Sequence, residues 1–140
     1  MTLRVIWAVT VALGGLACST ATDSGPPPVV LLGTWSYTGA ETGSAITLTG
    51  TLTVSSQSGK SLTGSAAWTE SDGVGGTTPL SGPVTGRALD STTVNFDVFL
   101  ASATRHHLGT VKADTVSGTW VDVTPGGPGA SGTFRAVLGP

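Results

Sequence analysis

The sequence predicts an all-β domain, an eight-stranded antiparallel up-and-down barrel, with a β-sandwich as the alternative. Thr, Ser and Gly account for 24, 15 and 21 of the 140 residues, and these residue types favour strands, turns and loops over helices. Apolar residues alternate with Thr or Ser along many segments, which is the period-2 pattern of a strand with one buried face. Charged residues make up 10% of the chain and hydrophobic residues 39%, a balance that fits one ordered domain.

The alternation predicts eight strands joined by turns. In residues 46–54, Thr fills every second position between apolar residues or Gly. Similar runs, separated by turn-rich stretches, place the strands near 30–38, 46–54, 61–69, 79–88, 93–100, 104–112, 115–123 and 130–138. Short connections imply antiparallel neighbours, and closure into a barrel removes exposed strand edges. Pro83 in the fourth run predicts a bulge or a locally unpaired position.

A weak repeat places a glycine between two apolar residues on the same face of a strand. It occurs in six of the eight runs, for example as Leu31-x-Gly33-x-Trp35 and Val116-x-Gly118-x-Trp120. Two explanations fit an inward glycine: it lets a strand coil sharply, or it makes room for a neighbouring Trp or Phe. A sandwich has less need of such glycines than a small barrel.

The first 17 residues read as a secretory signal peptide. A short start with one basic residue, Arg4, precedes 13 mainly apolar residues from Val5 to Ala17. That length is short of the ~20 residues needed to span a bilayer as a helix, so cleavage is expected. We therefore divide the chain into the signal peptide (1–17), a flexible Ser/Thr/Pro tether that begins at Cys18 (18–29), and the barrel domain (30–140).

Gly15-Leu16-Ala17-Cys18 resembles the lipobox of bacterial lipoproteins. The resemblance implies that Cys18, the only cysteine, is diacylated on sulfur and becomes the mature N-terminus. Two or three acyl chains attach a protein stably to a membrane, whereas one chain binds only marginally. With Ser19 after the cysteine, the resemblance favours sorting to an outer membrane in a host that has one. The expected location is the bacterial cell envelope, at the outer membrane and facing the periplasm or the exterior.

Two further motifs resemble the calycin pattern of lipocalins and avidins. They are Gly33-Thr34-Trp35 in the first strand and Thr133-Phe134-Arg135-Ala136 in the last. The resemblance implies that Trp35 closes one end of a barrel and that Arg135 packs on it. Strict alternation puts Phe134 and Arg135 on opposite faces, with Phe134 the better core candidate. Biotin binding does not carry over, because residues 131–140 contain no carboxylate side chain.

Few residues suggest chemistry. His106 and His107 are adjacent and point to opposite faces of a strand, so they do not share a metal ion. The glycine repeat aims His107 inward and His106 outward, and Asp97 or Asp122 is a candidate partner for one of them. The sequence shows no nucleophile elbow and no phosphate-binding loop. We predict no catalytic residue, no metal site and no cofactor, and the net charge of −2 argues against nucleic-acid binding.

Two functions remain open for this lipoprotein. The first is a membrane-tethered binding module for a small apolar or amphipathic ligand. Its candidate ligand contacts are Trp35, Trp68, Phe96, His107 and Trp120. The alternative is a structural or protein-interaction lipoprotein with a solid barrel, whose loops at 39–45, 70–79 and 123–130 meet another envelope component.

Overall fold

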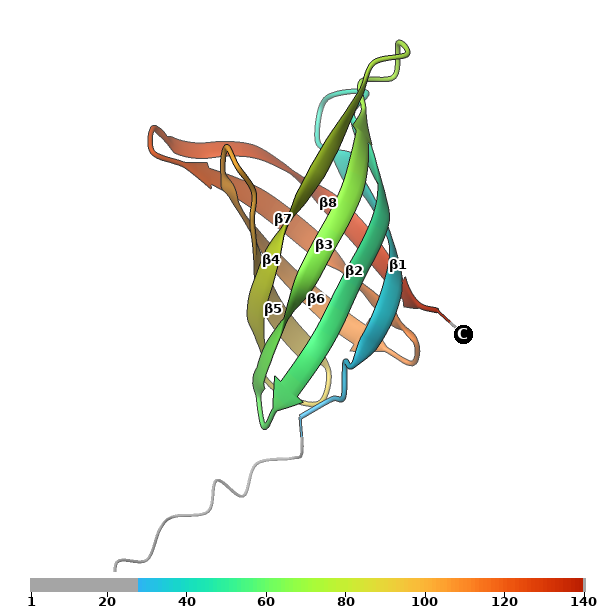
Figure 1. The fold of residues 1–140 in the computed structure, drawn as a ribbon, viewed down its shortest axis with the longest axis vertical. Coiled ribbons are helices and arrows are strands. Elements are labelled where there is room, and N and C mark those ends of the chain that lie inside the picture. The colour runs from blue at the N-terminus through green and yellow to red at the C-terminus, as the bar shows by residue number, and fades with distance from the viewer. Residues whose placement is uncertain (1–27, 140) are drawn as a thin grey trace, which may run out of the picture.

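The computed structural model describes residues 28–139, which form a closed barrel of eight antiparallel strands (Figure 1). The predicted barrel is confirmed. The strands are β1 (Gly33–Glu41), β2 (Thr47–Ser58), β3 (Ser61–Ser71), β4 (Thr77–Ala88), β5 (Thr93–Phe99), β6 (Thr104–Lys112), β7 (Thr115–Thr124) and β8 (Gly127–Leu138). The predicted signal peptide, Cys18 and most of the tether lie outside the described residues.

Each strand pairs with the next one in the chain, and β1 also pairs with β8 to close the barrel. Every strand thus has a neighbour on both sides, and only the loop-end parts of strands such as β4 and β8 extend beyond the pairing on one side. Among the described residues there is no helix long and apolar enough to cross a membrane. Buried and exposed positions alternate along the strands, so the predicted inward and outward faces are also confirmed.

The strand boundaries differ from the predicted ones most at β1, β2 and β8, and β2 runs to Ser58 instead of residue 54. The first strand begins at Gly33 instead of residue 30, because residues 28–32 leave the sheet and cover one end of the barrel. The last strand begins at Gly127 instead of residue 130, since a tight turn joins it to β7.

The sequence predicts either a bulge or a locally unpaired position at Pro83, and the bulge is wrong. Pro83 pairs in register with Ser65 of β3, and the register shifts lie elsewhere, at Val54/Ser56 and Val121/Val123. The other outcome is found instead. Strand β4 pairs with β5 only from Val84 to Ala88, so Pro83 is the first residue beyond that pairing and is unpaired on its β5 side.

The two ends of the barrel differ. We call one the N-terminal end: it carries residues 28–32 and the turns at 59–60, 89–92 and 113–114. The other, which we call the loop end, carries the connections at 42–46, 72–76, 100–103 and 125–126. In Figure 1 the N-terminal end is at the bottom and the loop end is at the top.

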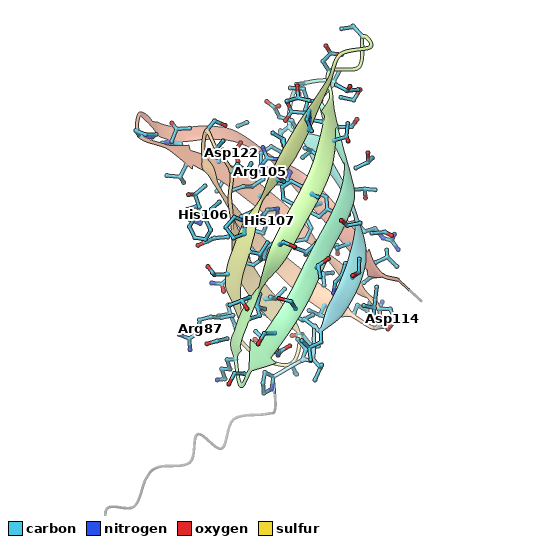
Figure 2. All side chains as sticks on the ribbon, in the orientation of Figure 1. Arg87, Arg105, His106, His107, Asp114 and Asp122 are labelled. Carbon is cyan, nitrogen blue, oxygen red and sulfur yellow. The ribbon has the colours of Figure 1, made fainter. Side chains whose placement is uncertain are left out.

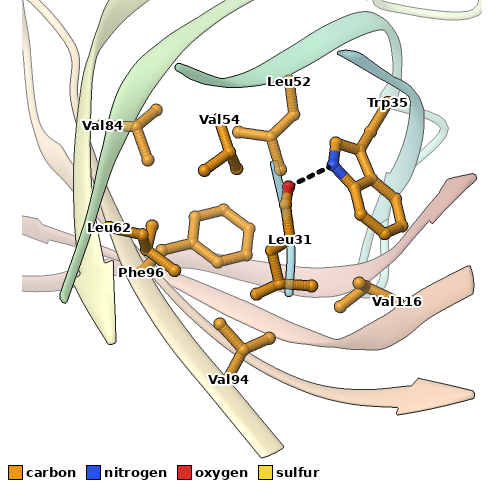
Figure 3. Close-up of a pocket in the computed structure, with 9 residues that line it drawn as sticks. All are labelled: Leu31, Trp35, Leu52, Val54, Leu62, Val84, Val94, Phe96 and Val116. Carbon is orange, nitrogen blue, oxygen red and sulfur yellow. Dashed lines mark hydrogen bonds between the residues drawn. The ribbon is translucent and has the colours of Figure 1, made fainter. Parts of the chain in front are cut away.

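The N-terminal end is sealed by Leu31, which is 3% exposed. The Leu31 N–H donates to Gln57 Oε1 at 2.8 Å, and Gln57 Nε2 donates to the Val29 carbonyl at 2.8 Å. The Trp35 indole N–H donates to the Leu31 carbonyl at 3.0 Å, as the dashed line in Figure 3 shows. The cavity left among these side chains has a volume of about 10 Å³ and an entirely apolar lining, so this half of the barrel is packed solid.

The inward glycines make room for both neighbouring backbones and aromatic rings. A Cβ on any of six of them would collide with a carbonyl oxygen of the adjacent strand: Gly50, Gly64, Gly82, Gly86, Gly118 and Gly132. At Gly132 the same Cβ would also lie 2.6 Å from Cε2 of Trp120, and at Gly109 it would lie 3.0 Å from Cζ of Phe134. The second explanation, room for a neighbouring Trp or Phe, therefore holds at Gly132 and Gly109, and the close approach of neighbouring backbones is an addition that the sequence did not predict.

The tight space at Gly132 yields a stability prediction. Gly132→Ala should lower the free energy of unfolding by about 1–3 kcal/mol, because the Trp120 ring or the Ala40 carbonyl must move to make room for the new Cβ. Gly126→Ala is the matched control, since its nearest neighbouring atom is Thr124 Oγ1 at 3.8 Å. It should change stability by less than about 0.5 kcal/mol. Urea unfolding followed by tryptophan fluorescence measures both, and equal losses for the two variants would contradict the prediction.

Candidate functional site

Five rings from five strands fill the middle of the barrel and form what we call the aromatic layer: Tyr37, Trp68, Phe96, His107 and Phe134. Tyr37 stacks on Trp68 with ring centroids 4.4 Å apart, and Phe96 stacks on His107 at 4.3 Å. Phe134 meets His107 edge-on at 5.0 Å. Such contacts stabilise the packing beyond the burial of apolar area, by about 0.5–1.5 kcal/mol per pair.

His107 is a neutral member of the aromatic layer. Its Nδ1 lies 3.2 Å from the Arg105 carbonyl, which only accepts, so Nδ1 carries the proton. Its Nε2 is then free to accept from the Tyr37 hydroxyl at 3.0 Å. Burial lowers the pKa of His107 to about 3, and burial also raises the pKa of Tyr37 well above its usual value. Neither group changes charge near neutral pH, which argues against acid–base chemistry at this pair.

Above the aromatic layer, toward the loop end, lies a buried ion pair between Arg105 and Asp122 (Figure 2). Strands β6 and β7 pair these two residues directly. Arg105 Nε donates to Asp122 Oδ1 and Nη2 donates to Oδ2, both at 2.7 Å. The guanidinium carbon also lies 4.0 Å from the centroid of the Trp120 ring, a cation–π contact.

Two buried donors in this region have no partner among the described residues. They are Nη1 of Arg105 and Nε1 of Trp68, whose residues are 4% and 3% exposed. The guanidinium carbon lies 5.8 Å from the centroid of the Trp68 ring, so the two groups are neighbours. A buried donor without an acceptor costs about 1–3 kcal/mol, which marks this place as one that a bound acceptor would stabilise.

Several inward-facing residues of the loop end are only partly buried, among them the apolar Leu80, Leu100 and Ala130, which pack against the core. Leu48, which pairs with Glu70 on β3, is fully buried at the same end. Glu41 and Glu70 also occupy inward positions by strand alternation, two residues beyond Gly39 and Trp68, and both are partly exposed. We call this half-open region the mouth of the barrel. It is apolar with acidic groups at its rim.

All five predicted contact residues lie inside the barrel, but at three levels. Trp35 lies at the sealed N-terminal end, beside Leu31. Trp68, Phe96 and His107 belong to the aromatic layer, and Trp120 lies under Arg105. The structure therefore brings Trp68 and Trp120 to the candidate site and keeps Trp35 away from it.

Sequence reasoning missed Tyr37, Arg105 and Asp122 as site residues. The signal was present in the alternation, because Tyr37 follows Trp35 by two positions and Asp122 follows Trp120 by two. Arg105 likewise precedes the inward His107 by two. The sequence does not show that Arg105, on the inward face of β6, forms an ion pair with Asp122 on the neighbouring strand β7.

The predicted contact between Arg135 and Trp35 does not form. Arg135 is exposed, and its guanidinium Nη2 lies 3.5 Å from the Thr115 hydroxyl on the outer face. Phe134 takes the inward position, as alternation predicted, and Arg105 is the arginine that packs on a tryptophan. Arg135 cannot reach Trp35 inside the barrel, because adjacent strand residues face opposite sides and Phe134 already faces the interior.

The two histidines face as predicted. His107 is buried, whereas His106 lies on the outer face with Nδ1 2.5 Å from Asp97 Oδ1 (Figure 2). Asp97, one of the two proposed partners, thus pairs with His106, and Asp122 pairs with Arg105 instead of a histidine. Within residues 28–139 no three His, Cys, Asp or Glu side chains are grouped so that they could hold a metal ion.

The fold is similar to that of small barrels among the solved structures. "Structure of EF1p2_mFAP2b bound to DFHBI" matches with a TM-score of 0.66 and 17% identity, over 78% of this chain and 94% of that one. "Structure of a redesigned beta barrel, mFAP1, bound to DFHBI" matches with a TM-score of 0.60 and 20% identity, over 78% and 94%. A de novo design of a fluorescence-activating beta barrel matches with a TM-score of 0.55 and 19% identity, over 75% and 92%.

At these identities the likeness concerns the barrel fold alone. No protein-family model and no curated protein matches the chain.

The neutral state of His107 makes stability depend on pH. Its pKa is about 3 in the folded barrel and about 6.5 in an unfolded chain, so the unfolded state binds a proton first as the pH falls. The neutral His107 contributes fully to the free energy of unfolding above pH ~6.5. This contribution is lost as the pH falls from ~6.5 to ~3, at up to about 1.4 kcal/mol per pH unit. Urea unfolding at a series of pH values measures this slope.

His107→Gln should flatten that slope, because an amide accepts from Tyr37 without titrating. His106→Gln on the outer face is the control and should keep the part of the slope that His107 produces. An unchanged slope in His107→Gln would show that other groups carry the acid sensitivity.

Proposed function

We propose that this protein is a lipid-anchored component of a bacterial cell envelope whose barrel binds a small amphipathic ligand at the loop end. The observation that carries the binding proposal is the pair of buried, unpartnered donors on Arg105 and Trp68 beneath the half-open mouth. A buried polar group is ordinarily paired, so an acceptor from a ligand would complete the site.

The mouth supplies the apolar part of the site. Leu80, Leu100 and Ala130 are partly exposed there and pack against the core. The N-terminal end is closed by Leu31 and holds a cavity of only about 10 Å³, so a ligand would enter through the loop end. Eight strands leave an interior that side chains can fill, and the ligand is therefore small and lies at the mouth.

The anchor fits this orientation. The described chain begins at the N-terminal end, so an acylated Cys18 would attach the barrel on the side opposite the mouth. The tether between Cys18 and the barrel spans at most roughly 30–35 Å when extended. The mouth would then face away from the outer membrane, into the periplasm or the exterior.

A second candidate function is the solid barrel that binds another envelope protein. The packed N-terminal half favours it, as do exposed apolar side chains near the loop end. Val74, at the tip of the β3–β4 loop, is 89% exposed, and Phe99 at the end of β5 is 44% exposed. Such residues are suited to contact with a protein partner.

The lipid anchor is tested by metabolic labelling with a radioactive fatty acid in the native host. Cys18→Ala should abolish the label and release the protein from the membrane fraction, because no other cysteine can be acylated. Ser19→Ala should keep both label and membrane attachment. Label that persists in Cys18→Ala would exclude this mode of anchoring.

Ligand binding is tested by native mass spectrometry of the protein extracted from its own membranes. We expect an added mass that matches no buffer or detergent component. Ala130→Trp should remove that mass by filling the mouth, whereas Ala67→Trp on the outer face should retain it. A wild-type spectrum with no added mass would favour the solid barrel.

A further inference from the structure

We infer that the ligand presents an uncharged hydrogen-bond acceptor, the carbonyl oxygen of a ketone, amide or ester, to Arg105 Nη1 and Trp68 Nε1. This inference rests on the proposed function and specifies the chemistry of the same site. It follows from which groups in the barrel are paired, which charges are already neutralised, and what lies at the mouth.

The missing partner is an acceptor, because both orphaned groups can only donate. The other donors of the same kind are satisfied. The indole N–H of Trp35 donates to the Leu31 carbonyl and that of Trp120 donates to the Thr133 carbonyl. The remaining guanidinium nitrogens of Arg105, Nε and Nη2, both bind Asp122. The two open donors are thus exceptions in an otherwise paired interior, and they occur on neighbouring groups, with the guanidinium carbon 5.8 Å from the centroid of the indole ring.

The electrostatics of the mouth favour a neutral acceptor over an anion. Asp122 already neutralises Arg105 through two hydrogen bonds of 2.7 Å, so the guanidinium offers a donor without a net charge to balance. Glu41 and Glu70 occupy inward positions near the rim and would repel a carboxylate or phosphate that enters. A cationic head group gains nothing from the two buried donors.

The burial of the residues around the site sets the orientation of the ligand. Both donors are buried, and Leu80, the partner of Trp68 on β4, is partly exposed at the loop end together with Leu100 and Ala130. The carbonyl therefore points inward, and the apolar body stays beside these side chains. The other members of the aromatic layer are closed to a ligand, since Tyr37 and His107 are no more than 2% exposed. The ligand is therefore held at its polar end, in contrast to a barrel that takes an apolar tail into its depth.

The test uses three probes with the same eight-carbon body: 2-octanone, octanoate and octylammonium. The protein begins at residue 18, carries Cys18→Ala and is labelled with ¹⁵N at its indoles. Its described tryptophans are Trp35, Trp68 and Trp120. We expect 2-octanone to shift the indole signal of Trp68, to slow its hydrogen exchange and to leave Trp35 unaffected. It should bind at least about tenfold more tightly than octanoate or octylammonium.

Trp68→Phe removes the indole donor while it keeps an aromatic ring in the layer, and it should weaken 2-octanone binding by about five- to tenfold. Trp35→Phe is the matched control at the sealed end and should bind as the unaltered protein does. A crystal structure of the complex should show the ketone oxygen on both donors.

Three results would overturn the inference. The first is octanoate or octylammonium binding as tightly as the ketone. The second is unchanged affinity in Trp68→Phe. The third is a structure in which an ordered water alone occupies the two donors at saturating 2-octanone. Each of these leaves the proposed function standing if the extracted protein still carries a mass that Ala130→Trp removes, so the two failures are distinguishable.

Discussion

The narrow interior of an eight-stranded barrel is the constraint on which the rest of this structure depends. Closing the sheet through the β1–β8 pairing forces all inward side chains into one column of limited width. Glycines recur on the inward face because carbonyl oxygens of adjacent strands and the rings of Trp120 and Phe134 need the space that a Cβ would occupy. The recurrent inward glycines are therefore a consequence of closure.

The same narrowness makes polar residues in the interior costly unless they are paired. The barrel pairs nearly all of them: His107 with Tyr37 and the Arg105 carbonyl, and Arg105 with Asp122. Removing one partner of such an ion pair costs about 3–5 kcal/mol, because a buried charge is left alone. In so well paired an interior, the two open donors on Arg105 and Trp68 are informative, since loose packing does not explain them.

Much of the fold was predictable because alternation acts locally. Residues 46–54 identify a strand without knowledge of the rest of the chain, and parity correctly placed His107 and Phe134 inside and His106 and Arg135 outside. The site was less predictable, because it depends on the register between strands. Tyr37 and His107 are 70 positions apart, and only the closed barrel brings them together. Local pattern likewise gives no way to see that Arg105 faces Asp122, or that Pro83 lies just past the end of the β4–β5 pairing.

The two ends of the barrel differ in how the apolar interior is covered. At the N-terminal end the chain covers it with its own Leu31, whose N–H and carbonyl are bound by Gln57 and Trp35. At the loop end the apolar side chains of Leu80, Leu100 and Ala130 stay partly exposed, near the buried ion pair of Arg105 and Asp122. A barrel with only a structural role has reason to cover both ends alike. The difference between the ends, together with an acyl anchor expected on the sealed side, is why we place ligand binding at the mouth.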